Sequence, residues 1–246
     1  MCNLYSLTKG QAAILAMVRT MADRTGNLPP MPGIFPDYPA PIIRNEQSGR
    51  ALAFARWGMP SPPATLTTSK RDPGVTNIRN TASPHWRRWL GIENRCVVPF
   101  TSFSEFNKSE GGDIWFAFKD TRPLAFFAGI WTPQWLSVRK VKEGETKNDL
   151  FAFLTTAPNA EVAAIHPKAM PVILRTAEEV EVWLNAPPQE AMKLQRPIPD
   201  GELKIVARGV KEDDVDLSQP PPEQDYGGGD FVSLDEEAST DDDTPL

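Results

Sequence analysis

The chain has 246 residues, of which 40% are hydrophobic and seven are tryptophan, with a formal net charge of -6. This size and composition suit one large domain with a packed core, whereas two cysteines are too few for a disulfide framework. No apolar run approaches the ~20 residues of a membrane-spanning helix, so we expect no membrane partner. The cysteine usage predicts a reducing, cytoplasmic setting, and a monomer is the default expectation.

The charge is divided unevenly along the chain. Residues 1–210 contain 25 Lys/Arg and 19 Asp/Glu, whereas residues 211–246 contain one Lys and thirteen Asp/Glu. We predict a basic domain over 1–210 and a disordered acidic tail over 211–246, because the tail is also poor in apolar residues. A basic domain is compatible with a nucleic-acid partner. We hypothesise that the tail competes with DNA, so its deletion should raise DNA affinity at low salt; a purely solubilising tail is the alternative.

Short helices and strands alternate in the prediction. Apolar spacing predicts helices over 9–22, 84–90, 160–165 and 176–184, with Thr8, Ser83 and Thr176 as capping residues of the first, second and fourth. Runs of β-branched and aromatic residues predict strands over 41–44, 51–56, 95–100, 114–118, 124–131, 150–156, 171–174 and 203–207, the first two forming a hairpin around the turn 47–49. The proline-rich stretch 28–41 and the polar stretch 133–149 are predicted to be loops. The sum is a single α+β domain with mostly antiparallel strands and peripheral helices.

The first two residues, Met1 and Cys2, offer unusual chemistry. Methionine aminopeptidase removes Met1 when the second residue is small, which would leave Cys2 with a free α-amine and a thiol. The ordinary pKa values of these groups are about 8 and about 8.5, so modest shifts would activate both at neutral pH. Such an aminothiol condenses with an aldehyde to an imine and then closes to a thiazolidine. A cysteine that is merely the second residue is the alternative.

Two further side chains are candidates for proton transfer. Glu105 alternates with Phe103, which places it on the apolar face of a strand and would raise its pKa; an ordinary carboxylate on the wet face is the alternative. His166 follows a short helix, in a loop of the kind where catalytic groups collect, whereas His85 fits a packing or surface role. We expect no metal or other cofactor, because the four side chains that could make a zinc site lack ligand spacing: Cys2, Cys96, His85 and His166.

Five short motifs occur in a fixed order: Met1-Cys2, Trp57-Gly58, Asn77-x-Arg79, Cys96-x-x-Pro99 leading to Phe103-x-Glu105-Phe106, and His166 followed by Met170-Pro171-Val172-Ile173-Leu174. Over roughly residues 2–207 the chain resembles the SRAP (SOS response-associated peptidase) family of abasic-site-processing proteins. The resemblance implies a barrel-like core. It also implies that the protein senses abasic sites in single-stranded DNA and forms a thiazolidine cross-link to them through Cys2. Lyase-like activity and autocatalytic removal of Met1 would accompany this reaction. The protein would act in the DNA damage (SOS) response, near the nucleoid.

The resemblance also implies a role for each matching residue. Asn77 would position the Cys2 amine, and Glu105 would donate and accept protons during sugar ring opening and imine formation. His166 would act as general acid and base on the sugar. Arg79 would hold a phosphate next to the lesion, and Trp57 would shape the pocket or stack near the DNA.

The chain departs from the family pattern in its DNA-holding residues. Asn3-Leu4 stands where members often have Gly-Arg, no tryptophan pair follows Trp57-Gly58, and Lys168 lies near a common arginine. Two alternative functions therefore accompany the prediction. One is an amidase or peptidase that uses Cys2 as an N-terminal nucleophile, with Asn77 as an oxyanion donor. The other is a DNA-binding module without chemistry.

Overall fold

The computed structural model describes residues 2–18, 22–66 and 71–213, and its centre is a closed five-stranded barrel. The barrel strands are β4 (Pro39–Glu46), β5 (Gly49–Trp57), β7 (Arg95–Phe100), β10 (Ala125–Val138) and β11 (Glu145–Thr156). Four neighbouring pairs are antiparallel, and the parallel pairing of β11 with β5 closes the ring. This arrangement confirms the predicted α+β fold with a barrel-like core.

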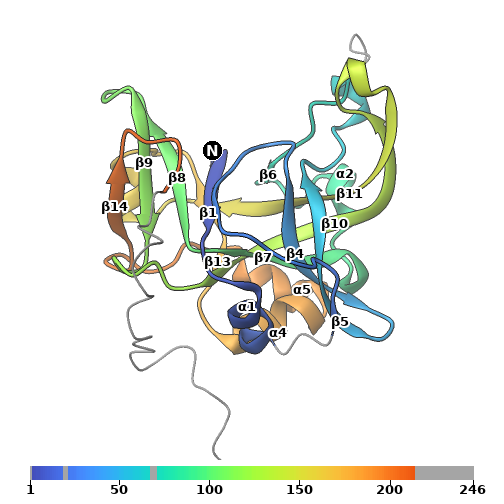
Figure 1. Ribbon diagram of the computed structural model, residues 1–246, viewed down its shortest axis with the longest axis horizontal. Helices are drawn as coiled ribbons and strands as arrows, with labels where there is room; N and C mark the ends of the chain where they lie inside the picture. Colours follow the sequence, from blue (N-terminus) through green and yellow to red (C-terminus); the bar gives the residue numbers. More distant parts are fainter. Residues whose placement is uncertain (1, 19–21, 67–70, 214–246) are drawn as a thin grey trace, which may run out of the picture.

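A second sheet lies beside the barrel, on the left of Figure 1. Its strands, in spatial order, are β14 (Lys204–Arg208), β9 (Gly112–Ala117), β8 (Ser102–Asn107), β1 (Leu4–Leu7) and β3 (Met31–Ile34). Four two-residue strands extend the barrel sheet: β2 (Ala22–Asp23), β6 (Asn77–Ile78), β12 (Met170–Pro171) and β13 (Ile173–Leu174). Within the second sheet, β1 lies on the barrel side of β8 (Figure 1).

The helices are short and peripheral: α1 (Gln11–Met17), α2 (Pro84–Arg87), α3 (Ala160–Ala163), α4 (Ala177–Asn185) and α5 (Pro188–Ala191). α1, α4 and α5 gather at the end of the molecule opposite the start of β1 (Figure 1). Thr176 caps α4 as predicted, because its hydroxyl accepts a hydrogen bond from the Glu179 amide at 3.1 Å. Within the described part of the chain, every helix falls short of the length and apolarity that crossing a membrane requires.

Aromatic rings fill the barrel interior. Phe127 stacks on Phe100 with centroids 3.8 Å apart, and it also contacts Phe153 and Tyr5. Gly129 is required here, because an added Cβ would lie 2.9 Å from the Cys96 sulfur. Close packing of this kind excludes water and fixes the strand ends from which the site residues emerge.

The structure corrects several predicted boundaries. The first helix spans Gln11–Met17 rather than 9–22; Gly10 precedes it without a side-chain cap, and Thr8 bonds to Thr101 instead. The other part of that prediction, 19–21, lies outside the described residues. α2 and α3 end before the predicted 90 and 165. The predicted loop 133–149 is mostly strand, because the β10–β11 ladder continues to Val138 and Glu145.

The two remaining loop and tail predictions also need adjustment. The proline-rich stretch 28–41 contains β3 and the start of β4, whose backbone groups pair with β1 and β5. The predicted tail begins at 211, yet Asp213 is fully buried and its carboxylate accepts hydrogen bonds from Ser102 and Arg122. Ordered packing therefore reaches at least Asp213, and residues 214–246 lie outside the described part of the chain.

Candidate active site

Cys2 lies two residues before β1 and is completely buried. Its sulfur lies 3.4 Å from the Leu4 carbonyl oxygen. Burial raises the pKa of the Cys2 thiol far above its usual range, and the nearby charge of Glu105 raises it further. The predicted activation of the thiol by a modest shift is therefore wrong in direction. In this environment the thiol keeps its proton at neutral pH and needs a neighbouring base to react.

Asn77 reaches Cys2 from a distant part of the sequence. It belongs to β6, which pairs with β11, and its side-chain amide donates a hydrogen bond of 2.7 Å to the Cys2 carbonyl oxygen. Its Oδ1 atom is buried and has no hydrogen-bond partner among the described residues. Asn77 thus fixes the backbone of Cys2 and keeps one acceptor for a further donor.

Glu105 is 1% exposed, which excludes the alternative of a carboxylate on the wet face of the strand. It belongs to β8, where Phe103 is also buried and Phe106 is exposed, as the predicted alternation requires. β8 pairs with β1 through Ser104 and Leu4, so Glu105 lies beside the end of β1 that bears Cys2. Burial raises the pKa of Glu105 to about 7, which suits the carboxyl group to proton transfer.

His166 lies in the loop between α3 and β12. Its Nδ1 atom donates a hydrogen bond of 3.1 Å to the Ala169 carbonyl oxygen and lies 3.6 Å from Glu105 Oε2. Because a carbonyl oxygen can only accept, the neutral ring carries its proton on Nδ1 and its lone pair on Nε2. Burial lowers the pKa of His166, and the charge of Lys168 adds to this effect. The ring is therefore mostly neutral near pH 7.

The structure thus brings four predicted residues together: Cys2, Asn77, Glu105 and His166. They come from the segment before β1, from β6, from β8 and from the loop after α3, so the junction of the two sheets creates the cluster. It combines a buried thiol, an amide that holds the thiol's backbone, and two groups that can exchange protons near neutral pH. Such a set can catalyse addition to a carbonyl carbon.

Arg79 lies beside this cluster and borders a small recess. Its Nη1 atom donates to the Lys168 carbonyl oxygen at 3.3 Å. The recess has a volume of about 280 Å³ and is lined by Arg79, Thr155, Thr156, Ala157 and Gln195. The hydroxyl of Thr155 is buried without a hydrogen-bond partner among the described residues. The exposed Arg79 guanidinium suits an anion such as a phosphate.

Two residues of this recess could not be predicted from the sequence. Gln195 Nε2 donates to the carbonyl oxygens of Arg79 and Thr155, at 2.8 and 3.1 Å, and so holds the two walls together. Thr155 was part of a predicted strand and nothing more. Residues as far apart as 79 and 195 come into contact only in the folded chain, and no local sequence pattern predicts that contact.

Trp57 is 1% exposed, so the predicted stacking on DNA is wrong for this side chain. Its ring packs against Tyr5 and Phe153, and its Nε1 atom donates to the Thr76 carbonyl oxygen at 3.1 Å. Trp57 therefore contacts β1 and the residue preceding Asn77, which is consistent with its predicted alternative, shaping the pocket.

The N-terminal departure from the family pattern also has a structural outcome. Leu4 is 4% exposed and packs within the protein as part of β1, so its side chain cannot contact a phosphate. Asn3 is exposed, and its Oδ1 atom accepts hydrogen bonds from Thr76 and Asn77 at 3.3 and 3.4 Å. This segment therefore braces the site.

The four side chains considered for zinc do not form a metal centre. His85 lies against the rings of Trp86 and Trp89, and its Nε2 atom is 2.9 Å from the Pro60 carbonyl oxygen, which confirms its packing role. Across residues 2–18, 22–66 and 71–213, no three His, Cys, Asp or Glu side chains group closely enough to hold a metal ion.

Comparisons with known proteins agree with this fold. The family model described as SOS response associated peptidase (SRAP) matches residues 1–212. No curated protein matches the chain in sequence. A solved protein from Bacteroides thetaiotaomicron is 23% identical, with 82% of this chain and 90% of that one covered and a TM-score of 0.64. One from Bordetella bronchiseptica is 23% identical (82% and 97% covered, TM-score 0.59), and a phage-related protein from the same organism is 17% identical (82% and 92%, TM-score 0.57).

Proposed function

The chain belongs to the SRAP family, and from this premise we propose that it recognises abasic sites in single-stranded DNA and links to them covalently through Cys2. Family membership supports a role in DNA processing during the SOS response. The observation that carries the finer proposal is the meeting of Cys2, Asn77, Glu105 and His166 at one buried site. The protein would act as a monomer in the cytoplasm, at the nucleoid when bound to DNA.

The first step is removal of Met1, because the Cys2 nitrogen is otherwise held in a peptide bond. Hydrolysis of that bond, by this site or by an aminopeptidase, consumes one water and frees the α-amine. The amine then attacks the aldehyde of the ring-opened abasic sugar, and loss of one water gives the imine. Finally the thiol adds across the C=N bond: sulfur bonds to carbon, and the thiol proton passes to nitrogen. The net cross-link formation releases one water.

The neighbouring side chains support each proton movement. Glu105, with its pKa raised to about 7 by burial, is partly protonated at neutral pH and can donate a proton to the leaving hydroxyl. Its carboxylate form can take the proton of the Cys2 thiol, which is needed because burial disfavours the free thiolate. His166, neutral near pH 7, would act on the sugar hydroxyl as acid and base. The unpartnered Oδ1 atom of Asn77 would accept a hydrogen bond from the freed amine.

The recess beside Arg79 supports the choice of DNA as substrate. A phosphate there would meet the Arg79 guanidinium while the sugar lies at Cys2. Lys168, whose backbone contacts Arg79, adds a positive charge at the same edge. These groups bind a backbone irrespective of base sequence, as a lesion sensor requires.

A denaturing gel of the protein with abasic single-stranded DNA tests the proposal. The wild-type chain and Cys96→Ala should give a band of DNA-linked protein, whereas Cys2→Ala should give none, since Cys96 is the only other thiol in the sequence. Equal bands for wild type and Cys2→Ala would overturn the proposal. Turnover of small amides by wild type without DNA would favour the amidase alternative, and DNA binding without any adduct would favour a binding module.

A further inference from the structure

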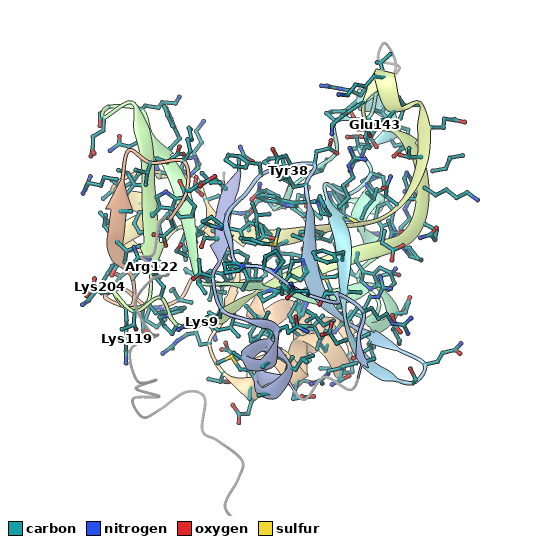
Figure 2. All side chains as sticks on the ribbon, in the orientation of Figure 1. Lys9, Tyr38, Lys119, Arg122, Glu143 and Lys204 are labelled. Carbon is teal, nitrogen blue, oxygen red and sulfur yellow. The ribbon has the colours of Figure 1, made fainter. Side chains whose placement is uncertain are left out.

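Tyr38 is the most exposed aromatic residue among the large apolar side chains that reach solvent in the described part of the chain, with 51% of its surface accessible. It lies in the turn between β3 and β4. Figure 2 shows it at the end of the molecule where β1 begins, away from the end that carries Lys9 and Lys119. An accessible aromatic ring at the end that bears the candidate site is available to contact a ligand bound there.

The turn holds Tyr38 in a defined position. The Tyr38 carbonyl oxygen accepts a hydrogen bond from the Trp57 amide at 2.9 Å, and the Asp37 amide donates to the Trp57 carbonyl oxygen at 2.8 Å. The Asp37 carboxylate is gripped by Arg56, with two hydrogen bonds of 2.7 Å. The Tyr38 ring meets Phe35 edge to face at 5.7 Å. Because its backbone is anchored, the ring loses little conformational freedom when a ligand binds.

Strand register places this turn at the end of β1 that bears Cys2. β3 runs antiparallel to β1, with Ile34 opposite Tyr5. Because the two strands are antiparallel, the residues after Ile34 and the residues before Tyr5 extend toward the same end of the sheet. The turn that carries the exposed ring therefore lies at the same end of β1 as the N-terminal segment, and β3 flanks β1 on the side opposite β8 and Glu105.

We propose that Tyr38 is a stacking platform for the base of a nucleotide next to the abasic site. The inference rests on the proposed function. An abasic nucleotide has no ring, so each neighbouring base loses a stacking partner on the side of the lesion. Single-stranded DNA commonly stacks its bases on protein aromatics, whatever their sequence. With the sugar at Cys2 and a phosphate at Arg79, the flanking base on the β3 side would lie over Tyr38.

The test separates binding from chemistry by using a tetrahydrofuran abasic analogue, which cannot open to an aldehyde. Fluorescence anisotropy of a labelled single strand should show that Tyr38→Ala weakens binding about tenfold, while Tyr38→Phe stays within about twofold because the ring is kept. Phe54→Ala is the matched control, because Phe54 is an exposed aromatic, 38% accessible, on β5. It should bind like wild type.

A second strand, which also lacks the bases on both sides of the lesion, makes the test specific for stacking. On this strand wild type and Tyr38→Ala should bind equally, since no ring remains to stack. Equal binding of the two proteins on the first strand, or the same loss on both strands, would overturn the proposal. Failure of wild type to cross-link a natural abasic site would instead refute the proposed function, so the two failures are distinguishable.

Discussion

The barrel interior and the Cys2 site are buried to the same degree but differ in what burial does. Phe127, Phe153 and Cys2 are all 0% exposed, and Glu105 is 1% exposed. In the barrel, burial joins apolar rings at contact distance and stabilises the fold. In the site, it leaves the Asn77 Oδ1 and Ser104 Oγ atoms without hydrogen-bond partners among the described residues and raises the pKa of Glu105.

The two regions therefore serve different functions within one fold. Buried polar groups cost stability wherever they lack partners. The closed barrel, with its stacked rings, offsets that cost and keeps the site rigid. Substitutions in the barrel should therefore change stability, whereas substitutions in the site should change chemistry and leave stability equal or higher.

The largest effect on stability should come from Phe127→Ala. It removes a ring that contacts Phe100, Phe103, Phe153 and Tyr5, and it leaves a cavity at the barrel centre. We expect the free energy of unfolding to fall by about 3–5 kcal/mol, measured by urea denaturation. The exposed Phe54→Ala should change it by less than about 0.5 kcal/mol. A loss below about 1 kcal/mol for Phe127→Ala would contradict the stabilising role of the barrel.

Glu105→Gln should change how the free energy of unfolding depends on pH, which no substitution of an apolar barrel residue would do. Burial raises the Glu105 pKa from 4.5 to about 7, so the folded state binds this proton more tightly than the unfolded state. This contribution to the free energy of unfolding is fully present below pH 4.5 and is lost as the pH rises to about 7, a change of about 3 kcal/mol. Glu105→Gln should lose this part of the pH dependence. The surface variant Glu110→Gln is the control, and an unchanged profile for Glu105→Gln would contradict the assignment.

The chemistry of the site should follow the same titration. If protonated Glu105 is the acid in imine formation, the ratio of wild-type to Glu105→Gln cross-linking rates should fall as the pH rises above about 7, by up to about tenfold per pH unit. The ratio cancels the titration of the α-amine, which both proteins share. Single-turnover rates from quenched gels measure it. A ratio independent of pH would exclude Glu105 as the proton donor.

The smallest effect should come from Arg79→Ala, which concerns the edge of the site. Loss of one phosphate contact should weaken binding of single-stranded DNA about tenfold and reduce the slope of log affinity against log salt by about 1. Arg208→Ala is the control, because Arg208 is an exposed arginine on β14 that pairs with Glu110. Equal salt slopes for wild type and Arg79→Ala would mean that no phosphate binds at Arg79.

Local patterns predicted much of this contrast. Alternation of period two placed Glu105 on the face of Phe103, and that face is buried. The hairpin of β4 and β5 and the Thr176 cap of α4 were also predicted, since each depends on residues close in sequence. Residue chemistry pointed to Cys2, Glu105 and His166, and the family resemblance added Asn77.

Contacts between distant residues were not predictable. The Gln195 side chain donates to the Arg79 carbonyl oxygen across 116 positions of sequence, and a glutamine just after the short helical turn 192–194 gives no sign of that role. The burial of Trp57 depends on β11, which lies far along the chain. Composition assigns Asp213 to the acidic tail. It does not show that Arg122 and Ser102, which are distant in sequence, donate hydrogen bonds to the Asp213 carboxylate.

The most direct test of the central claim is the intact mass of the protein after reaction with abasic single-stranded DNA. A thiazolidine at Cys2 predicts one product whose mass equals the chain without Met1 plus the oligonucleotide minus one water, and which survives without borohydride reduction because no imine remains. A product that retains Met1, or one that is captured only after reduction, would contradict the assignment of Cys2 as both amine and thiol.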